Sequence, residues 1–158
     1  MSIDELRDYG LVEMTDPEIA NFLASQRVGV LALPEADAPY LFPISYGFDG
    51  EDSLYFTYVS GSSSRKQRAT DAAGTASFLV FAVDTMYSWE SVQLTGRLEP
   101  VSESAWDDIE ELLADVWTPE LFKNASLSGD VELYEFRIGD RSGVKHQGLP
   151  PGLEPSGT

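Results

Sequence analysis

The chain has 158 residues, 42% of them hydrophobic, and its 27 acidic against ten basic residues give a net charge of −17. Length and composition predict one folded domain, and the charge argues against partners such as nucleic acid or an anionic membrane face. The absence of cysteine excludes disulfides and thiolate metal sites, and without an apolar run long enough for a bilayer or a signal segment we expect a soluble, cytoplasmic protein.

The acidic composition also carries a prediction about habitat. Repulsion among dispersed carboxylates should destabilise the compact chain in dilute buffer and be screened at high salt. With few lysines besides, this composition is typical of a protein from the salt-loaded cytoplasm of a halophile.

The first part of the chain predicts a helix followed by three strands. Residues 1–14 are polar and weakly periodic, which indicates an arm on the surface. Thr15 and Glu18 have the spacing of a capping box, so a short helix should begin there and end near Ser25. Strands are expected at residues 27–33, 40–48 and 53–59. Pro43 indicates an edge or a bulge, and Asp49-Gly50 a hairpin.

The second part predicts another helix, then a long antiparallel stretch. A helix over residues 63–72 should end before Gly74, and strands should follow at 75–83 and at 87–101, the latter bent or bulged at Gly96. Residues 102–116 show a helical apolar stripe, and a shorter helix should begin at Thr118. Residues 131–138 alternate as a final strand, and we expect residues 149–158 to form a mobile tail beyond a domain of residues 1–148.

Six strands joined mostly by short turns, with helices inserted between them, predict a fold of the α+β class. The expected architecture is a mostly antiparallel, closed or partly closed β-barrel with flanking helices.

The segment between the strand at 53–59 and the next helix combines small hydroxyl residues with cations. Ser62, Ser63 and Ser64 precede Arg65 and Lys66, and three of the ten cations of the chain fall within residues 65–68. Backbone N–H groups and the dipole at a helix start, together with Arg or Lys, bind phosphate well. The alternative is a serine-rich turn whose cations offset an acidic surface.

The usual catalytic constellations are missing from the sequence. His146 is the only histidine and is expected to be a solvated residue near the tail, so a histidine triad or a multi-histidine metal site is not available. No Walker loop or dinucleotide-binding glycine pattern occurs. A phosphate cradle in such a chain favours a bound cofactor that performs the chemistry itself.

Two further stretches support a cofactor site. Thr57 and Tyr58 end the strand that leads into the cradle, and the Thr57 hydroxyl could meet the edge of a planar heterocycle. Farther along, alternation places four side chains on one face of the strand at 87–101, namely Trp89, Ser91, Gln93 and Thr95. Alternatively, this face is simply exposed to solvent.

The order of these patterns resembles the flavin-binding split-barrel family related to pyridoxamine 5′-phosphate oxidase. The likeness covers residues 15–101. It rests on the opening helix and first strand, on Tyr-Phe-Thr (55–57) followed by Ser-Arg-Lys (64–66), and on Trp-Glu-Ser-Val (89–92) before Gly96.

This resemblance implies an FMN bound at a homodimer interface, and a small-molecule substrate. Arg65 and Lys66 would hold the phosphate with Ser62, Ser63 or Ser64, and Thr57 and Tyr58 would lie along the ring or ribityl chain. The strand at 40–48 would approach the isoalloxazine through Ile44, Ser45 and Tyr46, and the later strand through Ser91, with Trp89 nearby. Tyr46 and Tyr58 are the nearest acid–base candidates, although packing explains both better, so the catalytic residues stay unknown.

Two departures argue against the vitamin substrate itself. Residues 43–48 read Pro-Ile-Ser-Tyr-Gly-Phe, without the basic residues of the true oxidases, and Arg137 and Arg141 do not reproduce the C-terminal arginine motif. The resemblance therefore implies a broader relative, an FMN-dependent oxidoreductase. A deazaflavin-dependent reductase, or a flavin- or haem-binding carrier or sensor, remains as an alternative.

Overall fold

The computed structural model describes residues 10–59, 65–112 and 131–147. The helices are α2 (Asp16–Ser25), α3 (Arg65–Ala73) and α4 (Trp106–Leu112), with a 3-10 turn η2 (Glu103–Ala105) before α4. The strands are β1 (Leu11–Glu13), β2 (Val28–Leu33), β3 (Tyr40–Ser45), β4 (Gly47–Phe48), β5 (Ser53–Val59), β6 (Thr75–Thr85), β7 (Ser88–Pro100) and β8 (Val131–Gln147).

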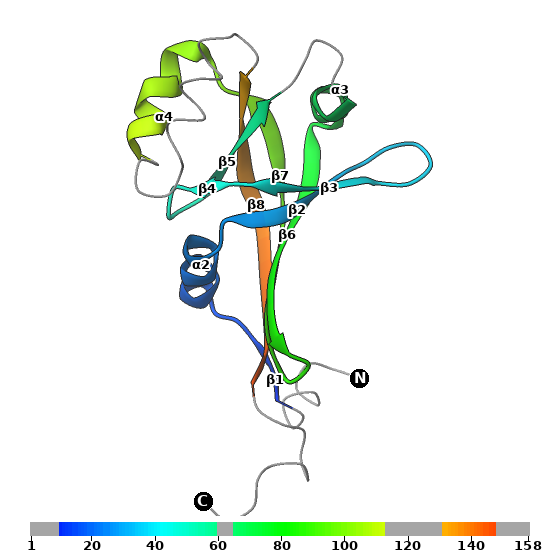
Figure 1. Cartoon of the computed structure of the whole chain (residues 1–158), viewed down its shortest axis with the longest axis vertical. Coiled ribbons are helices and arrows are strands. Elements are labelled where there is room, and N and C mark those ends of the chain that lie inside the picture. Colours follow the sequence, from blue (N-terminus) through cyan, green and yellow to red (C-terminus); the bar gives the residue numbers. More distant parts are fainter. Residues whose placement is uncertain (1–9, 60–64, 113–130, 148–158) are drawn as a thin grey trace, which may run out of the picture.

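All of these strands belong to one antiparallel sheet in the order β3-β2-β6-β7-β8-β5-β4, with β1 paired to β8. The sheet curls into a half-barrel with the helices at its flanks (Figure 1), which confirms the predicted α+β split barrel. Within the described ranges it has eight strands rather than the expected six. The stretch at 40–48 divides into β3 and β4, and β1 arises in the presumed arm.

Several local predictions are confirmed. Thr15 accepts a hydrogen bond from the Glu18 N–H, and the Glu18 carboxylate accepts one in return, which completes the capping box of α2. Gly50 and Gly74 both have positive φ angles, of 87° and 69°, where turns reverse the chain. Pro43 lies on the edge strand β3, where no ladder partner needs its missing N–H.

The predicted bulge occurs at Gly96, between residues 95 and 96 of the β7–β8 ladder. The site also requires glycine because of a close approach. A Cβ at Gly96 would lie 2.3 Å from the Arg137 carbonyl oxygen and 2.9 Å from the Phe136 ring. Phe136 therefore packs across β7 only because residue 96 has no side chain.

The final strand corrects two predictions. β8 continues from Val131 to Gln147, nine residues beyond the expected end at Ile138, and pairs with β7 along most of its length. His146 is consequently a strand residue with 9% of its surface exposed, and not a solvated tail residue. Its segment has little apolar alternation, so pairing with β7 and β1 decides its conformation.

The core lies on the concave side of the sheet. It is built on aromatic side chains whose ring centroids lie 5.1–6.2 Å apart, Phe56, Phe78 and Phe136 among them. A smaller cluster of Tyr55 and Leu133, on the other face of β5 and β8, packs against Trp106 and Ile109 of α4. The remainder of the helix expected at 102–116, the helix expected from Thr118 and the C-terminal tail lie outside the described residues.

Candidate functional site

The two cations of the predicted cradle open helix α3 and rest on aromatic rings from strand β3. The Arg65 guanidinium carbon lies 3.9 Å from the centroid of the Tyr40 ring, and Lys66 Nζ lies 4.9 Å from that of Phe42. Arg65 also pairs with Glu35 across 3.1 Å, with 62% of its side chain exposed. Both cations are therefore oriented by contacts of moderate strength that leave Arg65 open to an anion. Ser62, Ser63 and Ser64 lie outside the described residues.

Thr57 carries an unusual polar atom. Its Oγ1 is buried, and no hydrogen-bond partner for it occurs in the part of the chain that the structure describes. Strand alternation points Thr57 away from the core that holds Phe56 and Tyr58, beside its ladder partner Leu133. Because a buried hydroxyl without a partner costs free energy, this atom fits a site built to bond a polar group of a ligand.

The two predicted tyrosines lie in the core. The Tyr46 hydroxyl donates to the Leu23 carbonyl oxygen at 2.7 Å, and the Tyr58 hydroxyl lies 2.7 Å from Thr70 Oγ1. Burial raises the pKa of Tyr46 and raises that of Tyr58 to about 12, so both are neutral at physiological pH. Their side chains hold elements together, as the packing interpretation expected.

The two predicted site residues within β3 are more accessible than these tyrosines. Ile44 is half-buried and packs against the core, while Ser45 is exposed and pairs with Val28 of β2. Both stand near the end of the edge strand, where a ligand could reach backbone and side chain. Their assignment to an isoalloxazine contact stays a prediction.

Trp89 and Ser91 lie on the predicted polar face of β7, and Trp89 is next to His146, which the sequence did not place in the site. Trp89 pairs with His146, their ring centroids are 6.1 Å apart, and Ser91 pairs with Val144. His146 Nδ1 lies 2.8 Å from the Tyr87 carbonyl oxygen, which can only accept, so Nδ1 carries a proton. The pairing of Trp89 with residue 146 could have been foreseen only if the length of β8 had been known.

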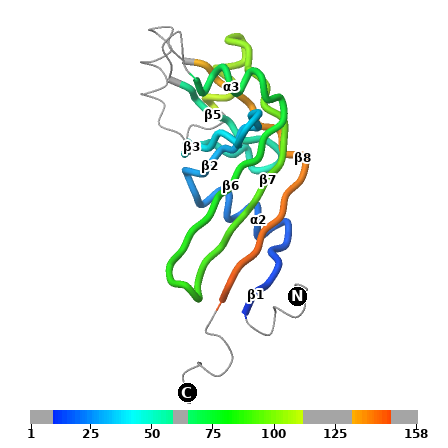
Figure 2. Tube along the Cα trace, turned by 90° about the vertical axis from the view of Figure 1, so that its right-hand side faces the viewer, coloured from blue at the N-terminus to red at the C-terminus, as the bar shows by residue number. Residues whose placement is uncertain are grey.

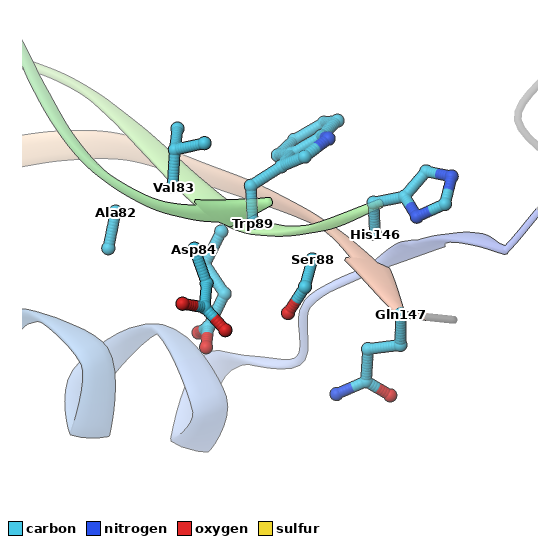
Figure 3. Close-up of a pocket in the computed structure, with 8 residues that line it drawn as sticks. Ala82, Val83, Asp84, Ser88, Trp89, His146 and Gln147 are labelled. Atoms are coloured by element: carbon cyan, nitrogen blue, oxygen red, sulfur yellow. The ribbon is translucent and has the colours of Figure 1, made fainter. Parts of the chain in front are cut away.

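A shallow pocket of about 240 Å³ surrounds this end of the sheet. In Figure 3, Trp89 and His146 extend from one side of the strands, while Asp84, Ser88 and Gln147 extend from the other. Glu90 also lines it. With two carboxylates in its wall, this pocket is poorly suited to a phosphate.

The predicted site residues therefore form two separate groups within one chain. The cations lie at the α3 end of the sheet, whereas Trp89 lies near the β6–β7 turn at the opposite end (Figures 1 and 2). Arg65 contacts Tyr40, which lies one residue beyond the level of Ser77 of β6, and Trp89 pairs with Val83, six positions from Ser77 in the opposite direction. At about 3.3 Å per residue, roughly 20 Å separates the two groups.

The sequence did not indicate the residues that support the cations. Tyr40, Phe42 and Glu35 contact them from the β2–β3 hairpin, and Tyr134 of β8 donates to Asp71 of α3. From the sequence, Tyr40 and Phe42 were only residues of the strand expected at 40–48. Their role appears when that strand lies against the helix.

Arg137 and Arg141 lie away from the cations. Arg137 is 3.8 Å from a Glu135 carboxylate oxygen, and Arg141 pairs with Asp52 at 3.0 Å. Both guanidinium groups thus face acids of the chain's own surface.

Residues 10–59, 65–112 and 131–147 contain no helix with the length and apolar character needed to cross a membrane. Nor does this part of the chain bring three or more His, Asp or Glu side chains together as metal ligands.

The fold has solved counterparts. An FAD-binding protein from Mesorhizobium loti superimposes with a TM-score of 0.69 and 22% identity, over 87% of this chain and 98% of that one. An FAD and heme binding protein from Mycobacterium smegmatis superimposes with a TM-score of 0.72 and 20% identity, over 91% of this chain and 77% of that one. A conserved hypothetical protein from Mycobacterium tuberculosis superimposes with a TM-score of 0.68 and 23% identity, over 94% of this chain and 96% of that one.

No curated protein matches the chain. The profile of the family described as pyridoxamine 5′-phosphate oxidase, however, matches residues 15–145, which span the capping box of α2, the cation pair of α3 and nearly all of β8. By this match the chain is a member of the pyridoxamine 5′-phosphate oxidase family.

Proposed function

We propose that this protein binds FMN and acts as an oxidoreductase on a small molecule. The observation that carries the proposal is the buried Thr57 hydroxyl, which has no hydrogen-bond partner among the described residues and lies on the strand that leads to the Arg65 and Lys66 pair. The Thr57 hydroxyl would form a hydrogen bond with a polar atom of the flavin, and Arg65 and Lys66 would neutralise its phosphate. Bound FMN would supply the redox chemistry, and the chain would orient it and exclude water.

A phosphate held at the start of α3 would meet favourable electrostatics. Arg65 and Lys66 stand in the first turn of the helix, where the dipole is positive and where that turn holds no acidic residue. Arg65 can present two N–H groups to phosphate oxygens, and Lys66 adds a point charge. The same cradle would accept the phosphate nearest the ribityl chain of FAD, which the FAD-binding proteins of similar fold make the second candidate cofactor.

We further propose that a second copy of the chain completes the site. The face of β2, β3 and β6 that points away from the core exposes large apolar side chains, with exposed fractions of 52–65% for Val28, Leu41, Phe81 and Val83. Covering such a face is favourable, and a soluble chain rarely leaves it open. A partner could also bring its Trp89 and Ser91 to the cations of this subunit, which one chain alone keeps about 20 Å apart.

The flavin proposal is tested by titration of the purified protein with FMN. Arg65→Ala combined with Lys66→Ala should raise the dissociation constant at least about tenfold, because charge-assisted phosphate bonds are lost. Arg97→Ala with Arg137→Ala is the matched control. These two residues face each other on β7 and β8, and their loss changes the net charge equally. An unchanged titration in the first double variant would remove the proposal.

Two measurements refine the assignment. Protein purified in high salt, which should retain its cofactor, is analysed by visible absorption and mass spectrometry. If the bound molecule is FAD or a deazaflavin, the proposal that the cofactor is FMN is wrong. For the dimer, Phe81→Glu with Val83→Glu should give a monomer by sedimentation and weaken FMN binding. A wild-type monomer that binds FMN fully would contradict the shared site.

A further inference from the structure

Helix α3 has few apolar contacts to hold it on the sheet. Its nine residues, Arg-Lys-Gln-Arg-Ala-Thr-Asp-Ala-Ala, include three cations, and its buried residue is Thr70, with 2% exposure. Ala69 and Ala73 add only small, partly buried side chains. The position of this helix therefore depends strongly on its polar contacts, since most helices are held by an apolar stripe that this one lacks.

The first polar contact runs from strand β5 to the backbone of Lys66. Thr70 Oγ1 donates to the Lys66 carbonyl oxygen at 2.7 Å, which uses its single proton. The Tyr58 hydroxyl, also 2.7 Å from Thr70 Oγ1, must then be the donor in their contact. With 4% of Tyr58 exposed, this chain of two hydrogen bonds links the sheet interior to the residue that carries a cradle cation.

The second contact comes from strand β8. The Tyr134 hydroxyl donates to Asp71 Oδ1 at 2.8 Å, and its ring lies 4.7 Å from the Tyr58 ring. Burial and the neighbouring Asp71 carboxylate raise the pKa of Tyr134, so the hydroxyl remains a donor. Two adjacent tyrosines, from two paired strands, thus hold two successive residues of α3.

The heads of the two cations rest on a different strand. Arg65 lies over Tyr40 and Lys66 over Phe42, both from β3. Any shift of α3 relative to the sheet would therefore displace both cations from the rings that orient them.

We propose that Tyr58 and Tyr134 are positioning residues for phosphate binding, acting through Thr70 and Asp71 to hold α3 so that Arg65 and Lys66 converge on one anion. The inference rests on the proposed flavin function and deepens it, since it assigns the phosphate group, rather than the ring, to this end of the sheet.

The test compares FMN with riboflavin, which has the same ring system and no phosphate, by fluorescence titration of wild type and variants. Tyr58→Phe with Tyr134→Phe should weaken FMN binding at least about fivefold and change riboflavin binding less than about twofold, because the variant keeps both rings and loses only the hydroxyl contacts. Ser53→Ala is the matched control. It removes another buried hydroxyl, which donates to Glu135 at the far end of β5, and should leave both titrations unchanged.

A second pair of variants tests the same contact if the tyrosine double variant does not fold. Asp71→Ala removes the acceptor of Tyr134 and should weaken FMN binding selectively, whereas Asp71→Asn keeps an oxygen at that position and should restore most of it. Equal weakening of both flavins, or unchanged FMN binding in the tyrosine and Asp71→Ala variants, would overturn the positioning role. Wild type that binds neither flavin, or binds both equally well, would instead overturn the proposed phosphate site on which the inference rests.

Discussion

The Glu35 carboxylate and the Arg65 guanidinium form an ion pair across 3.1 Å, between the β2–β3 hairpin and the first residue of α3. This contact places an acid of the chain where a ligand phosphate is expected. Glu35 must release or share Arg65 when an anion binds, so the pair opposes binding by its own free energy.

Replacing Glu35 with Gln should therefore strengthen FMN binding. An exposed ion pair is worth up to about 1 kcal/mol, which corresponds to about a fivefold lower dissociation constant. Asp37→Asn, in the same exposed hairpin, alters the net charge equally and should have a smaller effect. If both variants bind alike, the improvement reflects total charge rather than release of Arg65.

Removal of the Thr57 hydroxyl should affect the stability of the protein and its affinity for flavin in different directions. Thr57→Val removes a buried oxygen that lacks a partner within the described residues, so the free energy of unfolding without ligand should stay the same or rise, by up to about 1–3 kcal/mol. Flavin affinity should fall in the same variant. Thr57→Ser, which keeps the hydroxyl, should retain affinity, and a Val variant that is both less stable and fully competent to bind flavin would contradict the assignment.

Gly96 should tolerate no side chain. Its Cβ would lie 2.3 Å from the Arg137 carbonyl oxygen, and backbone cannot move aside cheaply, so Gly96→Ala should lower the free energy of unfolding by about 1–3 kcal/mol or more. Gly139, beside the same bulge, would place its Cβ 3.4 Å from the nearest atom, the Thr95 carbonyl oxygen. Gly139→Ala should cost less in urea denaturation, and equal losses would contradict the close-approach explanation.

Glu18 should make stability depend on pH in the acid range. Its hydrogen bond with Lys145 is the main cause that lowers the pKa of Glu18 below its usual 4.5. A lowered pKa contributes stability that is present above pH 4.5 and lost as pH falls through the pKa of the folded state.

The measurement compares thermal unfolding of wild type and Glu18→Gln across this range. Gln keeps the capping-box spacing and removes the charge, so the advantage of wild type should be constant above pH 4.5 and shrink below it. Glu99→Gln, at an exposed position of β7, is the control. If the stability difference between wild type and Glu18→Gln does not change with pH, it arises from packing and not from the charge of Glu18.

The net charge of −17 predicts a strong dependence on salt. Between about 0.1 M and 1 M salt the Debye length falls from about 10 Å to about 3 Å, which screens repulsion among carboxylates. The melting temperature should therefore rise across a KCl series. A melting temperature independent of salt would remove the proposed adaptation to a salt-loaded cytoplasm.

The sequence was most informative where the physical cause is local. A capping box, a glycine with positive φ and a proline on an edge strand each act within a few residues, so Thr15, Gly74 and Pro43 could be interpreted without the fold. The order of the strands and helices predicted a mostly antiparallel α+β barrel, and the family resemblance implied its split form.

Only the tertiary structure determined which distant segments meet. Residues 139–147 lack a strand pattern of their own, and β7 and β1 supply the hydrogen bonds that extend β8 and bury His146. Tyr134 and Asp71 are 63 positions apart, and their contact depends on where α3 lies on the sheet. Local sequence thus determined most of the helices and strands and the position of the cations, whereas long-range backbone pairing and side-chain burial decided the extent of β8 and what holds those cations in place.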